Sequence, residues 1–289
     1  MRLAVLADIH SNATALTALR QRLTEEGVDG VCILGDLVSN CPQPRRVLDL
    51  LADWSAHTPC WVLAGNRERY LLAARQAGGP PWLSGSSGGS LRYTYQALRP
   101  ADWAYLEGLP TSLRLELPGC APIRLVHGSP GDDREHMIPG DPATEAYLES
   151  CAEPVMLCAH THRPFLYGHG GKLLVNPGPV SGALEGDVRA RYALLTGTAA
   201  GWRAQLAALA YDIAAEQRVF FEDDFLQQAG VWGWAIYHTL SRGGNLSYRC
   251  GLAAQRLASS EGCSERDWAR IPERFWVQAA RQMGLPLEP

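Results

Sequence analysis

Seven side chains of metal-binding type, all between residues 8 and 162, are the first candidates for chemistry in this sequence. They are Asp8, His10, Asp36, Asn66, His127, His160 and His162. Imidazole nitrogens combined with carboxylate and amide oxygens suit Mn, Fe, Zn, Co or Ni better than Ca. The set lacks cysteine, whose thiolate is the usual ligand of a structural zinc site. These residue types therefore predict a catalytic centre for divalent cations.

The charge of such a centre limits its substrate. With two divalent cations and only Asp8 and Asp36 as carboxylates, the formal charge of the site is about +2, which favours an anionic phosphate group. The whole chain has 26 basic and 30 acidic residues and a net charge of -4. It lacks the positive field that holds a nucleic-acid backbone, so a small phosphoester is the preferred substrate and a metal-dependent nuclease is disfavoured.

The position of the seven residues along the chain indicates how they converge. Each group comes directly after one of five apolar runs, at 3–7, 31–34, 60–64, 123–126 and 155–159. Such short apolar runs are typical of buried strands, and catalytic groups of α/β sheets gather at the carboxyl ends of the strands. Gly35, Gly65 and Gly128 adjoin three of the groups and indicate tight turns. We therefore expect the seven side chains to meet at one edge.

The elements between the runs complete an α/β pattern. Helical patterns at 13–26 and 44–55 alternate with the early runs, and a further strand is expected at 191–196. Residues 68–122 interrupt this alternation with helical stretches at 68–76 and 91–106, separated by a Gly/Ser-rich segment at 85–90 that is predicted to be a mobile loop. We predict a catalytic domain at 1–204, in which 68–122 forms a helical cap insertion, followed by a helical extension at 205–289.

The metal-binding residues also belong to recognisable short motifs. Asp8-Ile-His10, Gly35-Asp36, Gly65-Asn66, His127-Gly128 and His160-Thr-His162 follow one another in the order found in the calcineurin-like metallophosphoesterase superfamily, which the chain resembles over about residues 1–180. The motifs Asp8-Ile-His-Ser-Asn and Asn176-Pro-Gly further resemble those of the small bacterial and archaeal branch that includes the YfcE-like phosphodiesterases.

The resemblance implies a four-layer α/β/β/α sandwich with a dinuclear site. Asp8, His10 and His162 would hold one cation, Asn66, His127 and His160 the other, and Asp36 would bridge them. Mn is the favoured metal, with Fe, Zn, Ni, Co or Mg as alternatives. A metal-bridging hydroxide would attack phosphorus in line, with Asp36, Asn66 and His127 as catalytic residues.

One position departs from the superfamily. Where many members continue with Gly-Asn-His, this chain has Gly65-Asn66-Arg67. Arginine stays protonated and cannot act as a general acid at neutral pH, but it can bind a phosphate oxygen through two hydrogen bonds. We therefore expect Arg67 to bind substrate and esters with good leaving groups to be preferred, unless another acid such as His136 acts.

Three further residues are weaker candidates for substrate binding. Arg134 and His136 lie in a charged segment after His127 that is either a solvated loop or a specificity loop. Asn12 either caps the first helix or reaches a phosphate oxygen. The remaining histidines, His57, His169 and His238, are expected to be structural; they lie outside every motif described above.

Alternatives remain at the level of function. A phosphodiesterase is preferred because of the resemblance and the missing motif histidine, and a phosphomonoesterase or protein phosphatase is the alternative within the enzyme class. A metal-binding scaffold of the same fold with weak or no catalysis is the alternative outside it. The sequence offers neither a P-loop nor a GxGxxG motif, so nucleotide triphosphate and dinucleotide sites are not proposed.

The C-terminal extension at 205–289 and the composition of the chain support further predictions. Aromatic residues of the extension, including Trp232, Trp234, Trp268 and Trp276, are predicted to pack its helices onto the core or to form a homodimer interface. Residues 264–267 read as a capping box, and Pro272 is expected to kink a helix. Eight cysteines without a CxxC pair and the lack of an apolar stretch of ~18 residues favour a cytoplasmic protein without a membrane span.

Overall fold

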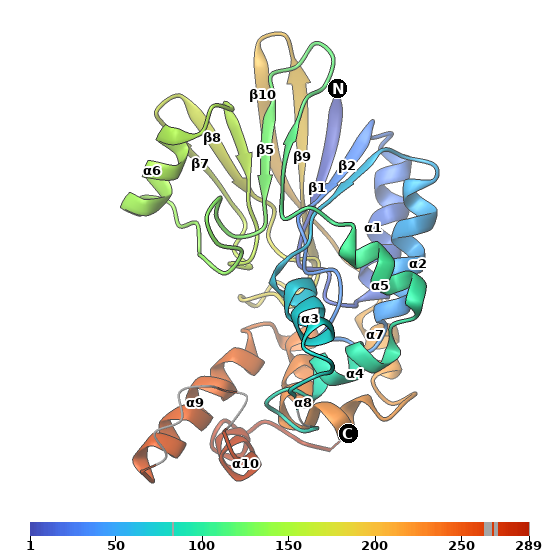
Figure 1. Cartoon of the computed structure of the whole chain (residues 1–289), viewed down its shortest axis with the longest axis vertical. Helices are drawn as coiled ribbons and strands as arrows, with labels where there is room; N and C mark the ends of the chain where they lie inside the picture. The colour runs from blue at the N-terminus through green and yellow to red at the C-terminus, as the bar shows by residue number, and fades with distance from the viewer. Residues whose placement is uncertain (83, 263–267, 269–270, 289) are drawn as a thin grey trace.

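A computed structural model describes residues 1–82, 84–262, 268 and 271–288 (Figure 1). Two five-stranded sheets pack face to face, with strand orders β10-β9-β1-β2-β3 and β4-β5-β6-β8-β7. Helices cover the outer faces of both sheets and extend beyond one end of them (Figure 1). None of the described helices is long and apolar enough to cross a membrane.

The first sheet contains four of the predicted strands, namely those expected at 3–7, 31–34, 60–64 and 191–196. Its strands are β1 (Arg2–Leu6), β2 (Gly30–Ile33), β3 (Cys60–Val62), β9 (Ala190–Thr198) and β10 (Gly201–Leu209). The first three are parallel, β9 is antiparallel to β1, and β10 is antiparallel to β9. Helices α1 (Ala13–Glu25) and α2 (Pro44–Ser55) connect the parallel strands and cover the outer face. The expected alternation of strand and helix is confirmed here.

The second sheet repeats this arrangement with one covering helix. Its strands are β4 (Ser112–Leu115), β5 (Ile123–Val126), β6 (Val155–Leu157), β7 (Phe165–His169) and β8 (Lys172–Asn176). Strands β5, β6 and β8 are parallel, and β4 and β7 pair antiparallel at the edges. Helix α6 (Pro142–Ser150) covers the outer face.

Three apolar layers hold these elements together. Along β1, Ala4 and Leu6 pack toward α1 and α2, whereas Leu3 and Val5 pack between the two sheets. Successive side chains of a strand point to opposite faces, so a strand that is buried on both faces needs an unbroken apolar run. A third layer, which includes Leu148, fills the space between the second sheet and α6. The predicted four-layer α/β/β/α sandwich is confirmed.

The segment 68–122 includes strand β4 of the second sheet as well as helices, and the helices are not all as expected. They are α3 (Asn66–Gln76), α4 (Gly89–Ala97) and α5 (Pro100–Glu107). The prediction of one helix over 91–106 is wrong, because Pro100 begins a new helix and the preceding Arg99 has an extended backbone. The Gly/Ser segment is also packed rather than free: the backbone N–H and hydroxyl of Ser86 both donate to Glu273.

The C-terminal helices form a unit with an apolar cluster of its own around the buried Phe275 and Trp276. The helices are α7 (Ile213–Val219), α8 (Phe225–Arg242), α9 (Leu246–Ser260) and α10 (Glu273–Gln282). Pro272 precedes the first turn of α10 and starts this helix instead of kinking it. The predicted capping box at 264–267 lies outside the described residues. Figure 1 shows α8, α9 and α10 beyond the end of the sandwich where α3 begins.

Candidate metal centre

The loops that follow the strands carry the predicted ligands in close register. The backbone N–H of Asp8 donates to Gly35 O at 3.1 Å, and the N–H of His10 donates to Asp36 O at 2.9 Å. These bonds continue the β1–β2 pairing beyond the strands. Ala159 N likewise donates to His127 O at 2.7 Å in the second sheet. The carboxyl ends of the strands therefore deliver ligands from both sheets to one place.

The backbone of these loops adopts a conformation that non-glycine residues avoid. The left-handed φ is 54° at Asp8, 52° at His10, 52° at Asp36, 63° at His160 and 55° at His162. Such a conformation costs on the order of 1–3 kcal/mol per residue, and it persists where packing enforces it, commonly at functional sites. The strain at five predicted ligands turns their side chains toward a common centre.

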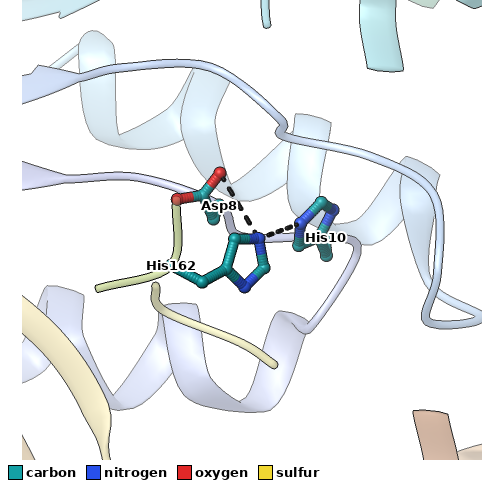
Figure 2. A group of neighbouring side chains, drawn as sticks. All are labelled: Asp8, His10 and His162. Carbon is teal, nitrogen blue, oxygen red and sulfur yellow. Dashed lines mark hydrogen bonds and ion pairs between the residues drawn. The ribbon is translucent and has the colours of Figure 1, made fainter. Parts of the chain in front are cut away.

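Asp8, His10 and His162 form the first group of potential metal ligands (Figure 2). Their ligand atoms all lie within 4.8 Å of one another. The Nε2 atoms of His10 and His162 are 3.1 Å apart, and His162 Nε2 is 3.7 Å from Asp8 Oδ1. His162 Nδ1 lies 2.9 Å from Gly182 O and donates to it, which leaves Nε2 free to accept a cation.

Asp8, Asp36 and His127 form a second group that shares Asp8 with the first. His127 Nδ1 donates to Leu34 O at 2.7 Å, so its Nε2 again faces the centre. Asp36 Oδ1 is 3.5 Å from His127 Nε2, and Asp36 Oδ2 is 3.8 Å from His10 Nε2. Each oxygen of Asp36 therefore faces an imidazole of a different group.

The protonation of these groups indicates that a cation belongs between them. Both carboxylate oxygens of Asp8 are buried without a hydrogen-bond partner, and burial raises the pKa of this carboxyl. Burial lowers the pKa of His10 well below its ordinary value, which keeps this imidazole neutral. An unpartnered buried carboxylate costs several kcal/mol unless a positive charge lies next to it. The donor set therefore fits divalent cations.

Asp36 is held in its charged form. Burial raises the pKa of its carboxyl, but the imidazoles of His127 and His10 and the guanidinium of Arg67 outweigh burial and lower it to about 2. Burial likewise lowers the pKa of His127, and Asp36 and Asp8 more than reverse this effect. Asp36 and His127 therefore stabilise each other as an ion pair in the absence of a cation.

Asn66 and His160 complete the set at a greater distance. Asn66 Oδ1 lies 3.0 Å from His127 Nε2. His160 belongs to neither group, but its ring centroid is 5.3 Å from that of His127, and the side chain lines the cavity over the centre. Burial lowers the pKa of His160 to about 3, so the imidazole is neutral and able to accept a cation.

Comparison with known proteins agrees with this arrangement. The family model of the calcineurin-like phosphoesterase superfamily domain matches residues 1–199. This chain belongs to that superfamily. The superfamily prediction made from the five motifs is therefore confirmed, and residues 200–289 lie beyond the matched region.

Three relatives illustrate the likeness. An uncharacterized protein, MJ0912 of Methanocaldococcus jannaschii, is 22% identical over 182 residues, which are 62% of this chain and 69% of that protein. The hypothetical protein PH1004 of Pyrococcus horikoshii is 23% identical with a TM-score of 0.70, covering 84% of this chain and 98% of that one. A metallophosphoesterase of Sphaerobacter thermophilus is 24% identical with a TM-score of 0.61, covering 79% and 98%. At these identities the structures show a shared fold.

Glu68 is a positioning residue of this metallophosphoesterase that the sequence did not reveal. Its buried carboxylate accepts hydrogen bonds from the backbone N–H groups of Asp36, Leu37, Val38 and Gly65 at 2.8–3.1 Å. Burial, with a contribution from Asp36, raises the pKa of the carboxyl to about 7. Glu68 thereby ties the loop after β2 to the loop after β3. The one available signal was its place directly after Arg67 in the third motif.

Two further details keep the loops of this metallophosphoesterase in place. A Cβ on Gly35 would lie 2.4 Å from Gly65 N, so the second and third motifs approach each other as closely as glycine permits. Asn176 Nδ2 donates to Ala159 O at 2.9 Å and to Thr161 Oγ1 at 3.0 Å. Asn176 therefore orients the loop that carries His160 and His162.

Two of the predicted substrate-binding residues line the cavity. Arg67 lies in the first turn of α3, with its Nε 3.9 Å from Asp36 Oδ2 and without a hydrogen-bond partner. His136 lies across the cavity, with its ring centroid 4.9 Å from that of His160. Both side chains therefore lie beside candidate ligands in the cavity wall.

The other two predicted substrate-binding residues lie elsewhere, and their assignments are corrected. Asn12 Oδ1 accepts from Ala15 N and caps α1, while its Nδ2 donates to Ser181 and Tyr211, so neither end of the side chain is free. Arg134 is exposed to solvent and pairs with Asp132. Neither residue lines the cavity.

The structural assignment of three other histidines agrees with their contacts. His57 Nδ1 lies 2.8 Å from Asp53 O, and His238 Nε2 lies 3.0 Å from Pro286 O. His169 forms ion pairs with two glutamates at the surface. None of these three histidines lines the cavity at the centre.

The cavity over the centre has a volume of about 680 Å³ and draws its walls from two parts of the chain. The C-terminal helices contribute Trp232, Ile236 and Tyr248. The sandwich and α3 contribute five of the candidate ligands and the adjoining arginine, namely His10, Asp36, Asn66, His160, His162 and Arg67. A second cavity of about 800 Å³ adjoins it and shares Asn66, Arg67, His160, Trp232 and Tyr248. No pattern in the sequence indicated that aromatic residues of the extension would reach the site.

Proposed function

We propose that this protein is a dinuclear metal-dependent phosphoester hydrolase that acts on phosphodiesters. The observation that carries this proposal is the pair of ligand groups that share Asp8, whose two buried oxygens have no other partner. His10, Asp36 and His162 of these groups line a cavity in a member of the calcineurin-like phosphoesterase superfamily. Their chemistry and their position are those of a catalytic centre rather than of a structural metal site.

The residues divide between two cations. Asp8, His10 and His162 would hold one, Asn66, His127 and His160 would hold the other, and Asp36 would lie between them, since its two oxygens face His10 and His127. When bound, two divalent cations supply Lewis acidity that activates water and neutralises charge on the phosphoryl group. Mn is the first candidate, and Fe, Zn, Ni, Co and Mg are the alternatives.

The remaining steps rest on the side chains around the centre. Arg67 lies next to Asp36 with an unpartnered Nε, so it can bind a phosphoryl oxygen through its guanidinium. Because arginine keeps its proton at neutral pH, Arg67 orients the ester but does not protonate the leaving group. His136 is the other predicted substrate-binding residue that lines the cavity over the centre. Burial lowers the pKa of its imidazole, which therefore carries little positive charge at pH 7. Esters with good leaving groups should therefore react fastest.

The preference for diesters rests on the space around phosphorus. A diester carries two organic groups, and the two adjoining cavities both reach Asn66, Arg67 and His160. One organic group can therefore occupy each cavity while the phosphate lies at the centre. The motif likeness to YfcE-like phosphodiesterases points the same way. A phosphomonoesterase acting on a small substrate would make no use of the second cavity.

The test compares bis-p-nitrophenyl phosphate with p-nitrophenyl phosphate. Chelator-stripped protein is refilled with Mn, Ni, Zn or Mg, and the rate of p-nitrophenol release is measured for the wild type and for Asp36→Asn. We expect metal-dependent hydrolysis of the diester, faster than that of the monoester and abolished by the substitution. Faster hydrolysis of the monoester would support a monoesterase. No turnover of either ester by protein that binds metal would support the scaffold alternative.

A further inference from the structure

The second cavity beside the metal centre has walls that are largely aromatic. It lies between α3, the Gly/Ser segment and the C-terminal helices. Six aromatic side chains line it: Tyr70, Trp82, Trp232, Tyr248, Trp268 and Trp276. The charged or imidazole side chains among its lining residues are Arg67 and His160, which also line the cavity over the centre. The cavity therefore suits an uncharged planar group better than a second anionic one.

Trp276 carries an unsatisfied hydrogen-bond donor in this wall. Its side chain is fully buried, and its Nε1 lacks a partner among the described residues. The indoles beside it are satisfied, because Trp232 Nε1 donates to Asn40 Oδ1 and Trp268 Nε1 donates to Gln255 Oε1. A buried indole N–H normally donates to an acceptor, and the absence of this hydrogen bond costs roughly 1–3 kcal/mol. The cavity therefore offers a ligand the rings of these three indoles rather than a free N–H group.

Tyr248 has the opposite character. Its side chain is 50% exposed, although it is one of the large aromatic residues that line both cavities. Its ring centroid lies 5.5 Å from that of Trp268. An exposed phenol next to an indole at the mouth of a cavity offers a face on which a planar ring can stack.

The wall opposite these residues is fixed by close contacts rather than by loose packing. A Cβ on Gly89 would lie 1.7 Å from Gln228 O, and a Cβ on Gly88 would lie 2.6 Å from the Cβ of Trp82. The left-handed Gly230, with φ of 53°, interrupts α8, and the next N–H, of Val231, donates to Ser86 Oγ at 2.7 Å. The Gly/Ser segment, α8 and α10 therefore form one preformed surface.

We propose that this aromatic cavity binds a planar heteroaromatic group of nucleobase size, carried on one ester arm of the phosphodiester substrate. The inference rests on the proposed function, because the shared residues Asn66, Arg67 and His160 place the cavity next to the phosphate at the centre. A volume of about 800 Å³ is large enough for a nucleoside. A nucleobase offers a flat face that stacks on tyrosine and tryptophan side chains such as Tyr248 and Trp268.

The test measures binding, so that it does not depend on turnover. Three methyl phosphodiesters are titrated calorimetrically into the full chain: adenosine 5′-methyl phosphate, its abasic analogue 1-O-methylribose 5-methyl phosphate, and hexyl methyl phosphate. Each titration is run with Mn and again with a chelator. We expect the adenosine ester to bind about 10-fold or more tightly than the abasic ester, with and without Mn, because the protein alone forms the cavity.

Two outcomes of these titrations would overturn the inference. Equal affinity for the adenosine and abasic esters would show that the base is not bound. Binding of the hexyl ester as tight as that of the adenosine ester would show an apolar rather than a heteroaromatic site. Loss of the phosphodiesterase activity on its own leaves the ratio of the affinities unaffected, so failure of the proposed function is recognised separately.

Variants then locate the site. Tyr248→Ala removes an exposed ring and should lower the adenosine-to-abasic affinity ratio about 3-fold or more. Trp276→Phe keeps a smaller ring in the buried position and should also lower the ratio, because the aromatic wall loses area. Phe221→Ala is the matched control, since Phe221 is 45% exposed in the same extension and lines neither cavity. An unchanged ratio in both cavity variants would contradict the proposal.

Discussion

The sandwich and the C-terminal helices contribute to the same cavity in different ways. In the sandwich, the residues that face the centre stand at the ends of strands, and five of them have a strained left-handed backbone. In the C-terminal helices, Trp232 and Tyr248 reach the site from ordinary helical positions. The sandwich therefore fixes the positions of individual atoms, whereas the helices provide area and shape.

This difference separates chemistry from recognition. The family model ends at residue 199, before any of the C-terminal helices begins. Groups that must hold a cation tolerate little displacement, whereas an aromatic wall can change its outline without affecting the reaction. We therefore expect substitutions in the sandwich to abolish the reaction and substitutions in the C-terminal helices to change KM alone.

The largest effect is expected for Asp8→Asn in the sandwich. Loss of the shared carboxylate should lower metal-dependent kcat by at least about 1000-fold. The same variant should stabilise the metal-free protein by on the order of 1–3 kcal/mol, because an unpartnered buried charge is removed. Urea denaturation with a chelator measures the second effect, and Asp53→Asn, at an exposed carboxylate, is the control. If metal-free Asp8→Asn were less stable than the metal-free wild type, this would contradict the conclusion that the buried Asp8 carboxylate has no partner when metal is absent.

Glu68→Gln tests whether loop positioning belongs to the sandwich. The amide can replace one carboxylate oxygen but places an NH2 group against backbone donors that now lack an acceptor. We expect a loss of about 2–4 kcal/mol in the free energy of unfolding, and weaker metal binding, since the ligand loops are no longer tied together. Denaturant titration and metal titration measure the two effects. Unchanged metal affinity would show that the loops hold their positions without Glu68.

Glu216→Gln tests the junction between the two regions. Glu216 lies on α7, is buried, and accepts from Thr14 N of the sandwich, and burial raises the pKa of its carboxyl from 4.5 to about 7. The folded protein then binds a proton that the unfolded chain releases, so stability falls as pH rises from about 4.5 to 7 and is level above that range. The wild type should lose on the order of 3 kcal/mol more than the variant between pH 4.5 and 8. Parallel pH profiles of urea denaturation would contradict this prediction.

Glu273→Ala is the smallest change and acts on the aromatic wall alone. Glu273 accepts two hydrogen bonds from Ser86, which holds the Gly/Ser segment against α8 and α10. We expect KM for bis-p-nitrophenyl phosphate to rise about 3- to 10-fold while kcat stays within 2-fold, a cost of roughly 1 kcal/mol in binding. Glu261→Ala, at an exposed ion pair with Arg274, is the control. A fall in kcat equal to the rise in KM would mean that the wall also positions the reacting groups.

Strands that are covered on both faces were predicted from their apolar runs. Residues 3–6 of β1, 31–33 of β2 and 155–157 of β6 form continuous apolar runs because two layers cover them. Strand β7 was not predicted, since its residues alternate between half-buried and exposed and include Gly168 and His169. Strand β10 was missed for the same reason: it is an edge strand with partly exposed residues throughout. Half-buried edge strands lack the hydrophobic run that signals a strand.

The candidate site also has features that could be predicted from the sequence and features that could not. The seven candidate ligands could be named because their residue types carry the chemistry and the strand ends bring them together. The sharing of Asp8 between two groups, the four N–H donors on Glu68 and the approach of Trp232 to the centre depend on contacts between distant segments. Nothing local distinguishes an aromatic residue that packs a helix from one that lines a cavity, so the aromatic residues were expected to act in packing or in a homodimer interface.

The most direct test of the account counts metal ions and turnover in the same sample. Chelator-stripped wild type and Asp36→Asn are dialysed against increasing Mn, the bound metal is measured by mass spectrometry, and hydrolysis of bis-p-nitrophenyl phosphate is followed at each point. The account predicts that the wild type binds two Mn per chain and that turnover appears with the second ion, while Asp36→Asn binds at most one and is inactive. Full turnover with a single Mn, or in Asp36→Asn, would contradict the dinuclear centre.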